Sequence, residues 1–197
     1  MKTALYFGSF NPPHCGHAAI ARYLREQAGF MDVRIVLSPQ NPLKDKKLLL
    51  SDAERIAMVK AWTDAVPYLS LCTLEFEMER PSYTYLTLRR LRLQEAETEF
   101  VLVMGADSLS NFPRWRAFDE IVREHELCVY PRDGYDMQAA CSALRKLLPD
   151  ARVRLLDAPV FPYSSTEIRR MRQAREDISG KVPAEVLDYI QKHDLYR

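Results

Sequence analysis

The sequence has few cysteines, almost no net charge and no long hydrophobic run. Its four cysteines are scattered without paired spacing, which argues against a disulfide framework and fits a reducing compartment. The 28 basic and 27 acidic residues leave a net charge of +1, so nothing indicates broad attraction to nucleic acid or to an anionic membrane. These shortages exclude the small disulfide-rich class and the strongly basic nucleic-acid-binding class.

The apolar runs of the sequence are short. Residues 1–7 are interrupted by Gly8 too early for a signal peptide, and no later run approaches the ~18–20 apolar residues of a membrane span. We therefore expect a soluble, cytoplasmic protein with no nucleic-acid partner and no membrane partner. The sequence leaves open whether the protein forms a homo-oligomer.

What the sequence does have is a regular alternation of apolar and amphipathic stretches. With 47% hydrophobic residues in 197, we expect one buried core and a single domain over residues 1–197. The patterns predict strands at residues 3–7, 33–37, 69–74, 99–104, 127–130 and 153–156. They predict helices at residues 18–25, 51–62, 81–94, 137–148, from 164 onward and at 184–190. This alternation predicts an α/β fold, a Rossmann-like doubly wound parallel sheet with helices on both faces.

The stretch from Gly8 to His17 joins the first predicted strand to the first helix and is rich in glycine and proline. Its glycines allow close backbone approach, and the amides at the helix start favour an anion. His14 and His17 flank this turn as candidate phosphate donors. The alternatives are surface histidines or a metal pair, but only His125 and His193 remain as further imidazoles and no Cys-x-x-Cys spacing is present. We therefore predict a phosphate site and no metal site.

Two further strand or loop ends offer groups for a nucleotide. Gly105 follows the strand at residues 99–104, and Asp107 is placed to accept hydrogen bonds from ribose hydroxyls, although it also suits a helix N-cap. A helix start near residue 164 makes a second anion site, whose alternative is a plain capping box. The side chains at that helix start are Ser164, Ser165, Thr166 and Arg169.

The loop after the second predicted strand carries Asn41 and Lys44. A loop at the carboxyl end of a strand is well placed to face a ligand, so Lys44 is a candidate cation near the phosphates. The alternative is an ordinary solvated lysine cluster, which is the common case for an isolated lysine.

Aromatic and hydroxyl side chains indicate a place for a flat heterocycle. Tyr83 and Thr84 stand at a predicted helix start with Ser82 as the expected N-cap. Trp115 follows a proline beside the expected pocket, where its face suits a pyridinium cation. The alternative for a tryptophan is a core position, because the side chain buries so much area.

These stretches resemble the nucleotidyltransferase superfamily with a His-x-Gly-His motif. The form Gly-Ser-Phe-Asn-Pro-Pro-His at residues 8–14 is similar to its bacterial nicotinate mononucleotide adenylyltransferase branch, and matches at residues 81–88, 105–115 and 164–169 extend the resemblance over nearly the whole chain. Many members of that branch carry Asp where this chain has Leu86.

The resemblance implies roles for individual residues. It implies that the catalytic residues are His14, His17, Lys44 and Arg169. It implies that ATP is bound by Gly8, Ser9, Phe10, His14, His17, Gly105, Asp107, Ser164, Ser165, Thr166 and Arg169. For the mononucleotide it implies Asn11, Asn41, Lys44, Tyr83, Thr84 and Trp115, with Trp115 stacked on the nicotinate ring.

The reaction implied by the resemblance is transfer of the adenylyl group of ATP to nicotinate mononucleotide, giving deamido-NAD and pyrophosphate, with Mg²⁺ shared by phosphates and waters. A phosphate monoester has its second pKa near ~6, so the attacking oxygen is already ionised at neutral pH and no general base is required. The alternatives are the same chemistry on nicotinamide mononucleotide or phosphopantetheine, or a nucleotide-binding regulator without catalysis. A zinc hydrolase is disfavoured by the missing ligands.

Overall fold

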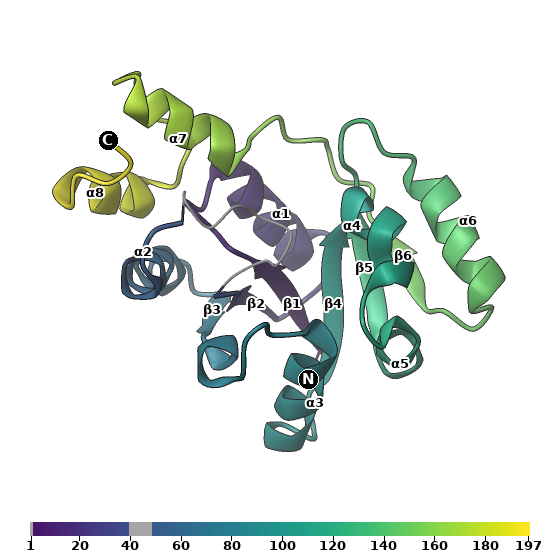
Figure 1. The fold of residues 1–197 in the computed structure, drawn as a ribbon. Helices are drawn as coiled ribbons and strands as arrows, with labels where there is room; N and C mark the ends of the chain where they lie inside the picture. The colour runs from purple at the N-terminus through teal and green to yellow at the C-terminus, as the bar shows by residue number, and fades with distance from the viewer. Residues whose placement is uncertain (1, 40–48) are drawn as a thin grey trace.

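A computed structural model describes residues 2–39 and 49–197 of the protein. The fold is built on one parallel sheet. The strand order is β3-β2-β1-β4-β5-β6, and every adjacent pair is parallel (Figure 1). The strands are β1 Lys2–Gly8, β2 Asp32–Leu37, β3 Leu69–Cys72, β4 Glu99–Gly105, β5 Glu126–Tyr130 and β6 Val153–Leu155. The predicted α/β class with a doubly wound parallel sheet is confirmed.

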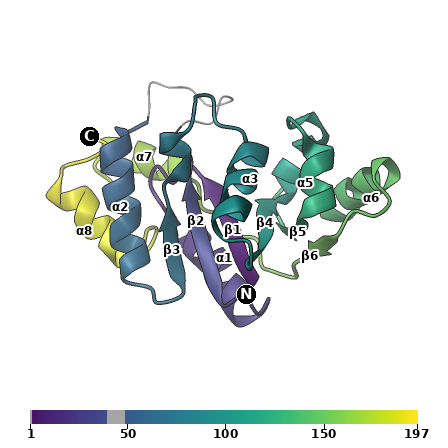
Figure 2. The same cartoon turned by 90° about the horizontal axis from the view of Figure 1, so that it is seen from below.

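Helices cover both faces of this sheet (Figure 1, Figure 2). The helices are α1 Cys15–Glu26, α2 Asp52–Asp64, α3 Thr84–Gln94, α4 Ala106–Asn111, α5 Phe118–Glu124, α6 Met137–Leu147, α7 Ser165–Gln173 and α8 Ala184–Lys192. Apolar side chains of α1, α2, α7 and α8 form one core cluster with one face of the sheet. Those of α3, α4, α5 and α6 form a second cluster on the other face. The central strands are therefore buried on both sides, as their continuous apolar runs predict.

Several boundaries differ from the predicted ones. The predicted strand at residues 69–74 ends at Cys72, and the chain continues as the short 3-10 helix Leu74–Glu77. Helix α3 begins at Thr84 with Tyr83 as its N-cap, so the expected Ser82 cap is wrong. The Ser82 hydroxyl instead donates to the buried Glu75 carboxylate at 2.9 Å. A tertiary partner therefore outcompetes the local cap.

The other differences lie at helix starts. Helix α1 begins at Cys15, earlier than expected, because His14 caps it. The N-cap of α4 is Gly105, and Asp107 lies within the first turn instead of capping it. Helix α5 was not among the predicted elements, and it follows Ala117, which adopts a left-handed φ of 53°. The predicted capping box of α2, between Ser51 and Glu54, is confirmed.

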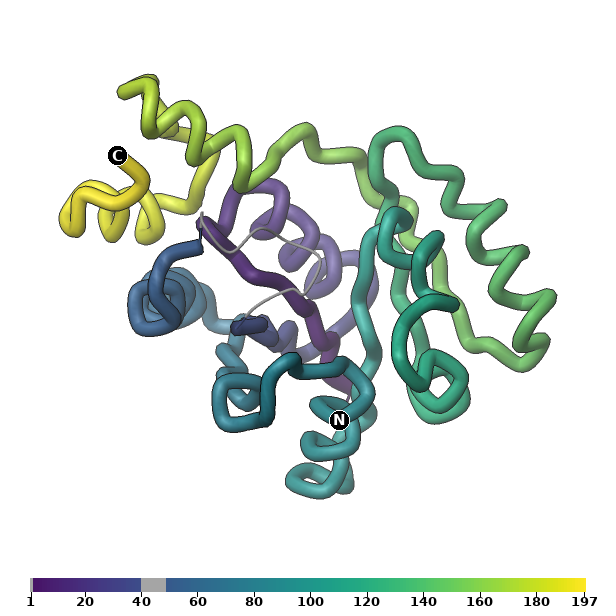
Figure 3. Tube along the Cα trace, viewed as in Figure 1, coloured from purple at the N-terminus to yellow at the C-terminus, as the bar shows by residue number. Residues whose placement is uncertain are grey.

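The parallel register brings the site-bearing ends of the strands to one edge of the sheet. Tyr6 of β1 pairs with Val103 of β4, so the turns that begin at Gly8 and Gly105 leave the same edge. The trace in Figure 3 shows the chain crossing this edge again where it enters α7. Within the described part of the chain, no helix has both the length and the apolar character to cross a bilayer.

Candidate active site

The turn after β1 is shaped by a buried aromatic ring. Phe10 is 2% exposed and adopts a left-handed φ of 41°, which a non-glycine residue rarely does. Its ring lies 4.8 Å from the His17 ring and packs against Tyr6. A side chain at Gly8 would meet this ring at 2.9 Å, so only glycine allows the strand to turn here. This turn, residues 8–17, is called the signature turn below, and it needs Gly8 for packing.

His14 and His17 form a reciprocal cap on α1. The His17 backbone N–H donates to His14 Nδ1, and the His14 backbone N–H donates to His17 Nδ1, each at 3.2 Å. The rings stack with their centroids 3.6 Å apart and their planes 20° apart. Because a backbone amide is always the donor, each Nδ1 is unprotonated and each neutral ring carries its proton on Nε2. The pair thus supplies two Nε2–H donors at a helix N-terminus.

A small, open cavity lies beside this histidine pair. Its walls include the first turn of α1 on one side and the end of β5 on the other, with Tyr130 and Arg132 among the lining residues. The hydroxyls of Tyr130 and Tyr6 lie 3.4 Å apart in this wall, and burial raises the pKa of both phenols. None of the predicted site motifs includes Tyr6, Tyr130 or Arg132, although the position of Arg132 directly after a strand was an available signal.

Asp107 and Arg132 meet at the carboxyl end of β4. The guanidinium Nε of Arg132 lies 3.6 Å from Asp107 Oδ1, and both side chains are partly exposed. A side chain at Gly105 would lie 2.9 Å from Arg132 Cγ, so Arg132 crosses directly over this glycine. A carboxylate and a guanidinium at the cavity mouth suit the hydroxyls and phosphates of a nucleotide.

The first turn of α7 is bonded directly to the signature turn. The Ser165 hydroxyl donates to the Pro12 carbonyl at 2.8 Å, and Arg169 Nη1 donates to the Asn11 carbonyl at 2.8 Å. Ser164 is the N-cap, since its hydroxyl accepts from the Glu167 N–H. Burial lowers the pKa of the Arg169 guanidinium, which stays charged at neutral pH. Two helix N-termini and two predicted anion sites therefore share one corner of the molecule.

The residues predicted for a pyridine ring lie on the other face of the sheet. The Trp115 ring is half-buried and lies edge-on to Phe112, with centroids 5.2 Å apart. The neighbouring Arg116 guanidinium sits 5.0 Å above the Tyr83 ring, which brings this segment to the start of α3. The start of α3, where Thr84 is the first helical residue, is held by the buried Glu75 carboxylate described above. Asn41 and Lys44 lie outside the described residues.

Comparison with known proteins decides the family. The sequence profile of the cytidylyltransferase-like family matches residues 5–171. The chain belongs to the cytidylyltransferase-like family.

Relatives of this cytidylyltransferase-like chain are named for one activity. A probable nicotinate-nucleotide adenylyltransferase of Flavobacterium johnsoniae is 34% identical over 197 residues and covers all of both chains. One of Bacteroides fragilis is 38% identical over 177 residues, covering 90% of this chain and 85% of its own. The Plasmodium falciparum nicotinic acid mononucleotide adenylyltransferase complexed with NaAD has a TM-score of 0.77 at 18% identity, covering 99% of this chain and 97% of that one. The resemblance predicted from the motifs is confirmed.

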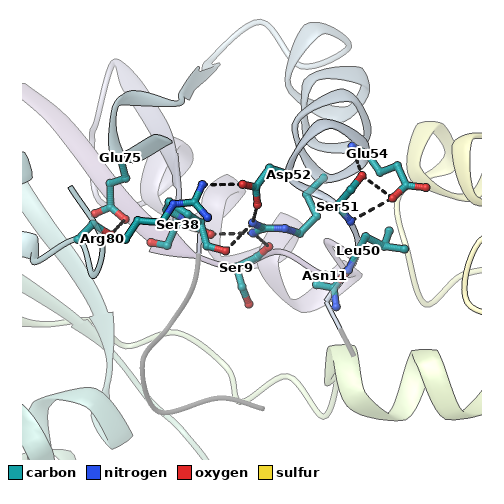
Figure 4. Close-up of polar contacts among 12 residues, drawn as sticks. Ser9, Asn11, Ser38, Leu50, Ser51, Asp52, Glu54, Glu75 and Arg80 are labelled. Carbon is teal, nitrogen blue, oxygen red and sulfur yellow. Dashed lines mark hydrogen bonds and ion pairs between the residues drawn. The ribbon is translucent and has the colours of Figure 1, made fainter. Parts of the chain in front are cut away.

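A residue that the sequence analysis passed over holds this cytidylyltransferase-like site together. Arg55 of α2 is fully buried. Its Nη1 donates to the carbonyls of Ser38 at 2.7 Å and Ser9 at 3.3 Å, and its Nη2 donates to the Pro39 carbonyl and to Asp52 Oδ1, both at 2.6 Å. Figure 4 shows Ser9 and Ser38 close to Asp52. An arginine in the apolar stripe of a helix was the signal that could have found it.

Asp52 completes this arrangement. Its second oxygen accepts from the Arg80 guanidinium at 2.7 Å, so one carboxylate joins two arginines (Figure 4). Burial raises the pKa of Asp52, but the hydrogen bonds from Arg80 and Arg55 outweigh it, and the net pKa lies below the ordinary value. The turn after β1 and the chain that leaves β2 are thereby tied to the start of α2.

Proposed function

We propose that this protein transfers the adenylyl group of ATP to nicotinate mononucleotide, giving deamido-NAD and pyrophosphate. The observation that carries the proposal is the stacked pair of His14 and His17, whose Nε2–H donors stand where α1 and α7 both begin. Two helix N-termini in one corner suit a reaction between two phosphorylated molecules. The activity for which the relatives are named supports the same reaction.

The chemistry requires alignment and charge relief. A 5'-phosphate oxygen of the mononucleotide forms a bond to the α-phosphorus of ATP, and the bond from that phosphorus to the bridging oxygen breaks. Pyrophosphate leaves with the electron pair, and no proton has to be removed, because the attacking phosphate is already ionised. The Nε2–H groups of His14 and His17 and the Arg169 guanidinium stabilise the charge that develops on the phosphoryl oxygens.

Mg²⁺ enters this proposal as part of the substrate, MgATP. Among the residues that the structure describes, no three His, Cys, Asp or Glu side chains form a group that could hold a metal ion. Mg²⁺ in nucleotide sites keeps several waters and binds substrate phosphates, so a dedicated protein cage is not required.

The remaining assignments are part of the same proposal. ATP lies against the cavity beside α1, with Asp107 at its ribose and the α7 start at its phosphates; Arg132 joins this set from its position in the cavity wall. The mononucleotide extends from Asn11 toward Tyr83, Thr84 and Trp115. Asn41 and Lys44 keep their predicted roles on sequence grounds.

We propose that one domain over residues 1–197 carries the whole reaction in the cytoplasm. Both core clusters pack against the same sheet, which supports a single domain. All four cysteines are free thiols, which suits a reducing compartment where ATP is available.

The test is pyrophosphate release from ATP and Mg²⁺, with nicotinate mononucleotide and nicotinamide mononucleotide compared at equal concentrations. We expect kcat/KM to favour the acid by about tenfold or more, because a charged carboxylate makes stronger hydrogen bonds than an amide. Equal rates would replace the proposal with a dual-specificity enzyme. Release with neither acceptor would overturn it in favour of another acceptor or a non-catalytic role.

A further inference from the structure

The Asn11 side chain is held by a residue far away in the sequence. Asn11 is 2% exposed. Its Oδ1 accepts a hydrogen bond from the Tyr196 hydroxyl at 2.8 Å, across 185 residues, and a second from the Leu50 N–H at 3.3 Å. A carboxamide oxygen has two lone pairs, so these donors fill both and fix which way the amide points. Tyr196 and Leu50 therefore set the orientation of the Asn11 amide.

The segment after α8 is bent so that Tyr196 reaches this position. Asp194 and Tyr196 both adopt left-handed φ angles, 53° and 61°, which non-glycine residues take only when surrounding contacts hold them. The Leu195 side chain is buried, and Arg172 of α7 donates to the Leu195 carbonyl at 3.4 Å. In Figure 3 the yellow end of the chain accordingly lies beside α7 and α8.

The Tyr196 phenol is a neutral donor in this setting. Its ring is largely buried, and burial raises the pKa of the hydroxyl far above the ordinary value. Arg169, which donates to the Asn11 backbone carbonyl, lies close enough to oppose that rise. Asn11 thus accepts a hydrogen bond at its main-chain carbonyl from α7 and another at its side chain from the segment after α8.

We propose that Tyr196 is a positioning residue of the active site, which fixes the orientation of the Asn11 carboxamide and thereby the binding of the acceptor mononucleotide. The inference rests on the proposed function. It assigns a role in substrate binding to the segment after α8, which none of the predicted motifs includes. Tyr196 acts through Asn11 and need not touch the substrate.

Tyr196→Phe tests this role, because the change removes only the hydroxyl. We expect the KM for nicotinate mononucleotide to rise about five- to tenfold, as for one lost hydrogen bond, with kcat and the KM for ATP much less affected. In an Asn11→Ala background the same change is expected to add nothing. Tyr189→Phe, which removes the hydroxyl of a half-buried tyrosine of α8, is the matched control and leaves the kinetics unchanged. An unchanged KM in Tyr196→Phe, or an equal effect with and without Asn11, would overturn the proposal.

A binding readout separates this inference from the proposed function. The side-chain amide of Asn11, assigned in NMR spectra by its loss in Asn11→Ala, is expected to shift in Tyr196→Phe and to stay in place in Tyr189→Phe. Added nicotinate mononucleotide is expected to shift the Asn11 amide signal. The concentration that saturates this shift is expected to be about fivefold higher in Tyr196→Phe than in the wild-type protein. If wild-type protein binds the mononucleotide but releases no pyrophosphate, the proposed reaction fails while this response still tests Tyr196. Identical Asn11 signals in wild type and Tyr196→Phe would refute the positioning role.

Discussion

Arginines serve opposite purposes at the carboxyl edge of the sheet and on the outer surface of α3 and α5. At the edge, Arg55 and Arg169 donate to main-chain carbonyls of the signature turn and its neighbours. On the outer surface, Arg89 and Arg92 of α3 pair with the Glu120 and Glu124 carboxylates of α5. The Arg55 side chain is 0% exposed, whereas that of Arg89 is 54% exposed. Arginine thus fixes backbone geometry at the carboxyl edge of the sheet, whereas on α3 it forms ion pairs at the solvent-facing surface.

The difference teaches where charge matters in this fold. An exposed ion pair gains little because water screens it and two long side chains must be ordered. A buried guanidinium that satisfies several carbonyls is costly to remove, because each carbonyl is left without a partner. Variants of the edge are therefore expected to have large effects, and variants of the α3–α5 surface small ones.

The largest effect is expected at the edge from His17→Ala. We expect kcat to fall about 10²- to 10³-fold, the usual loss for one donor that stabilises transition-state charge, with little change in ATP affinity. Pyrophosphate release and calorimetric binding of an ATP analogue measure the two quantities. The control is His193→Ala, exposed after α8. Normal turnover in a folded His17→Ala variant would remove His17 from the catalytic role.

Arg55→Met tests whether the buried arginine stabilises the fold more than the exposed Arg89 does. We expect the free energy of unfolding to fall by about 3 kcal/mol, because the Ser38 and Pro39 carbonyls lose their donor and Asp52 keeps only Arg80. Urea denaturation provides the measurement. A loss no greater than that of Arg89→Met would break the comparison.

His125, at the opposite end of the sheet, is a buried side chain whose effect on stability depends on pH. Its Nδ1–H donates to the Phe100 carbonyl at 3.1 Å, its Nε2 is buried without a partner among the described residues, and burial lowers its pKa from 6.5. Arg92 and Arg152 also disfavour the charged ring, while the Phe100 carbonyl and Glu124 favour it. Below 6.5 the unfolded chain therefore binds a proton that the folded protein does not, so stability falls as the pH falls until the folded ring also titrates.

His125→Asn keeps a donor for the Phe100 carbonyl but cannot titrate. We expect it to flatten the decline of unfolding free energy between about pH 7.5 and about pH 5.5, while His193→Asn keeps the wild-type slope. Denaturant unfolding at a series of pH values measures this. The same slope in both variants would show that His125 does not cause the decline.

The smallest effect is expected on the outer surface. Arg89→Met breaks the pair with Glu120, but the Arg89 side chain is 54% exposed and water screens the pair, so the thermal midpoint should move by about 1 °C or less. Differential scanning calorimetry detects such a shift. A loss comparable to that of Arg55→Met would mean that burial is not what separates the two regions.

Much of the fold and of the candidate site could be predicted from local sequence patterns. The strand runs, the capping box of Ser51 and Glu54, and the His-x-Gly-His turn are all readable because the interacting residues lie within a few positions of one another. The Ser82 cap failed because Glu75 binds its hydroxyl from a neighbouring segment. Arg55 was overlooked because its partners are main-chain carbonyls, which have no signature in the sequence.

By itself, then, the sequence determined the α/β class, the glycine- and proline-rich turn after the first strand and the family, since helix, strand and motif signals are short-range. Only the tertiary structure decided the strand order and the meeting of Asn11 with Arg169 and Tyr196, which are 158 and 185 residues away. The reason is physical: such contacts form only after both core clusters have packed against the sheet, and nothing within a local stretch encodes which distant donor will fill a given carbonyl.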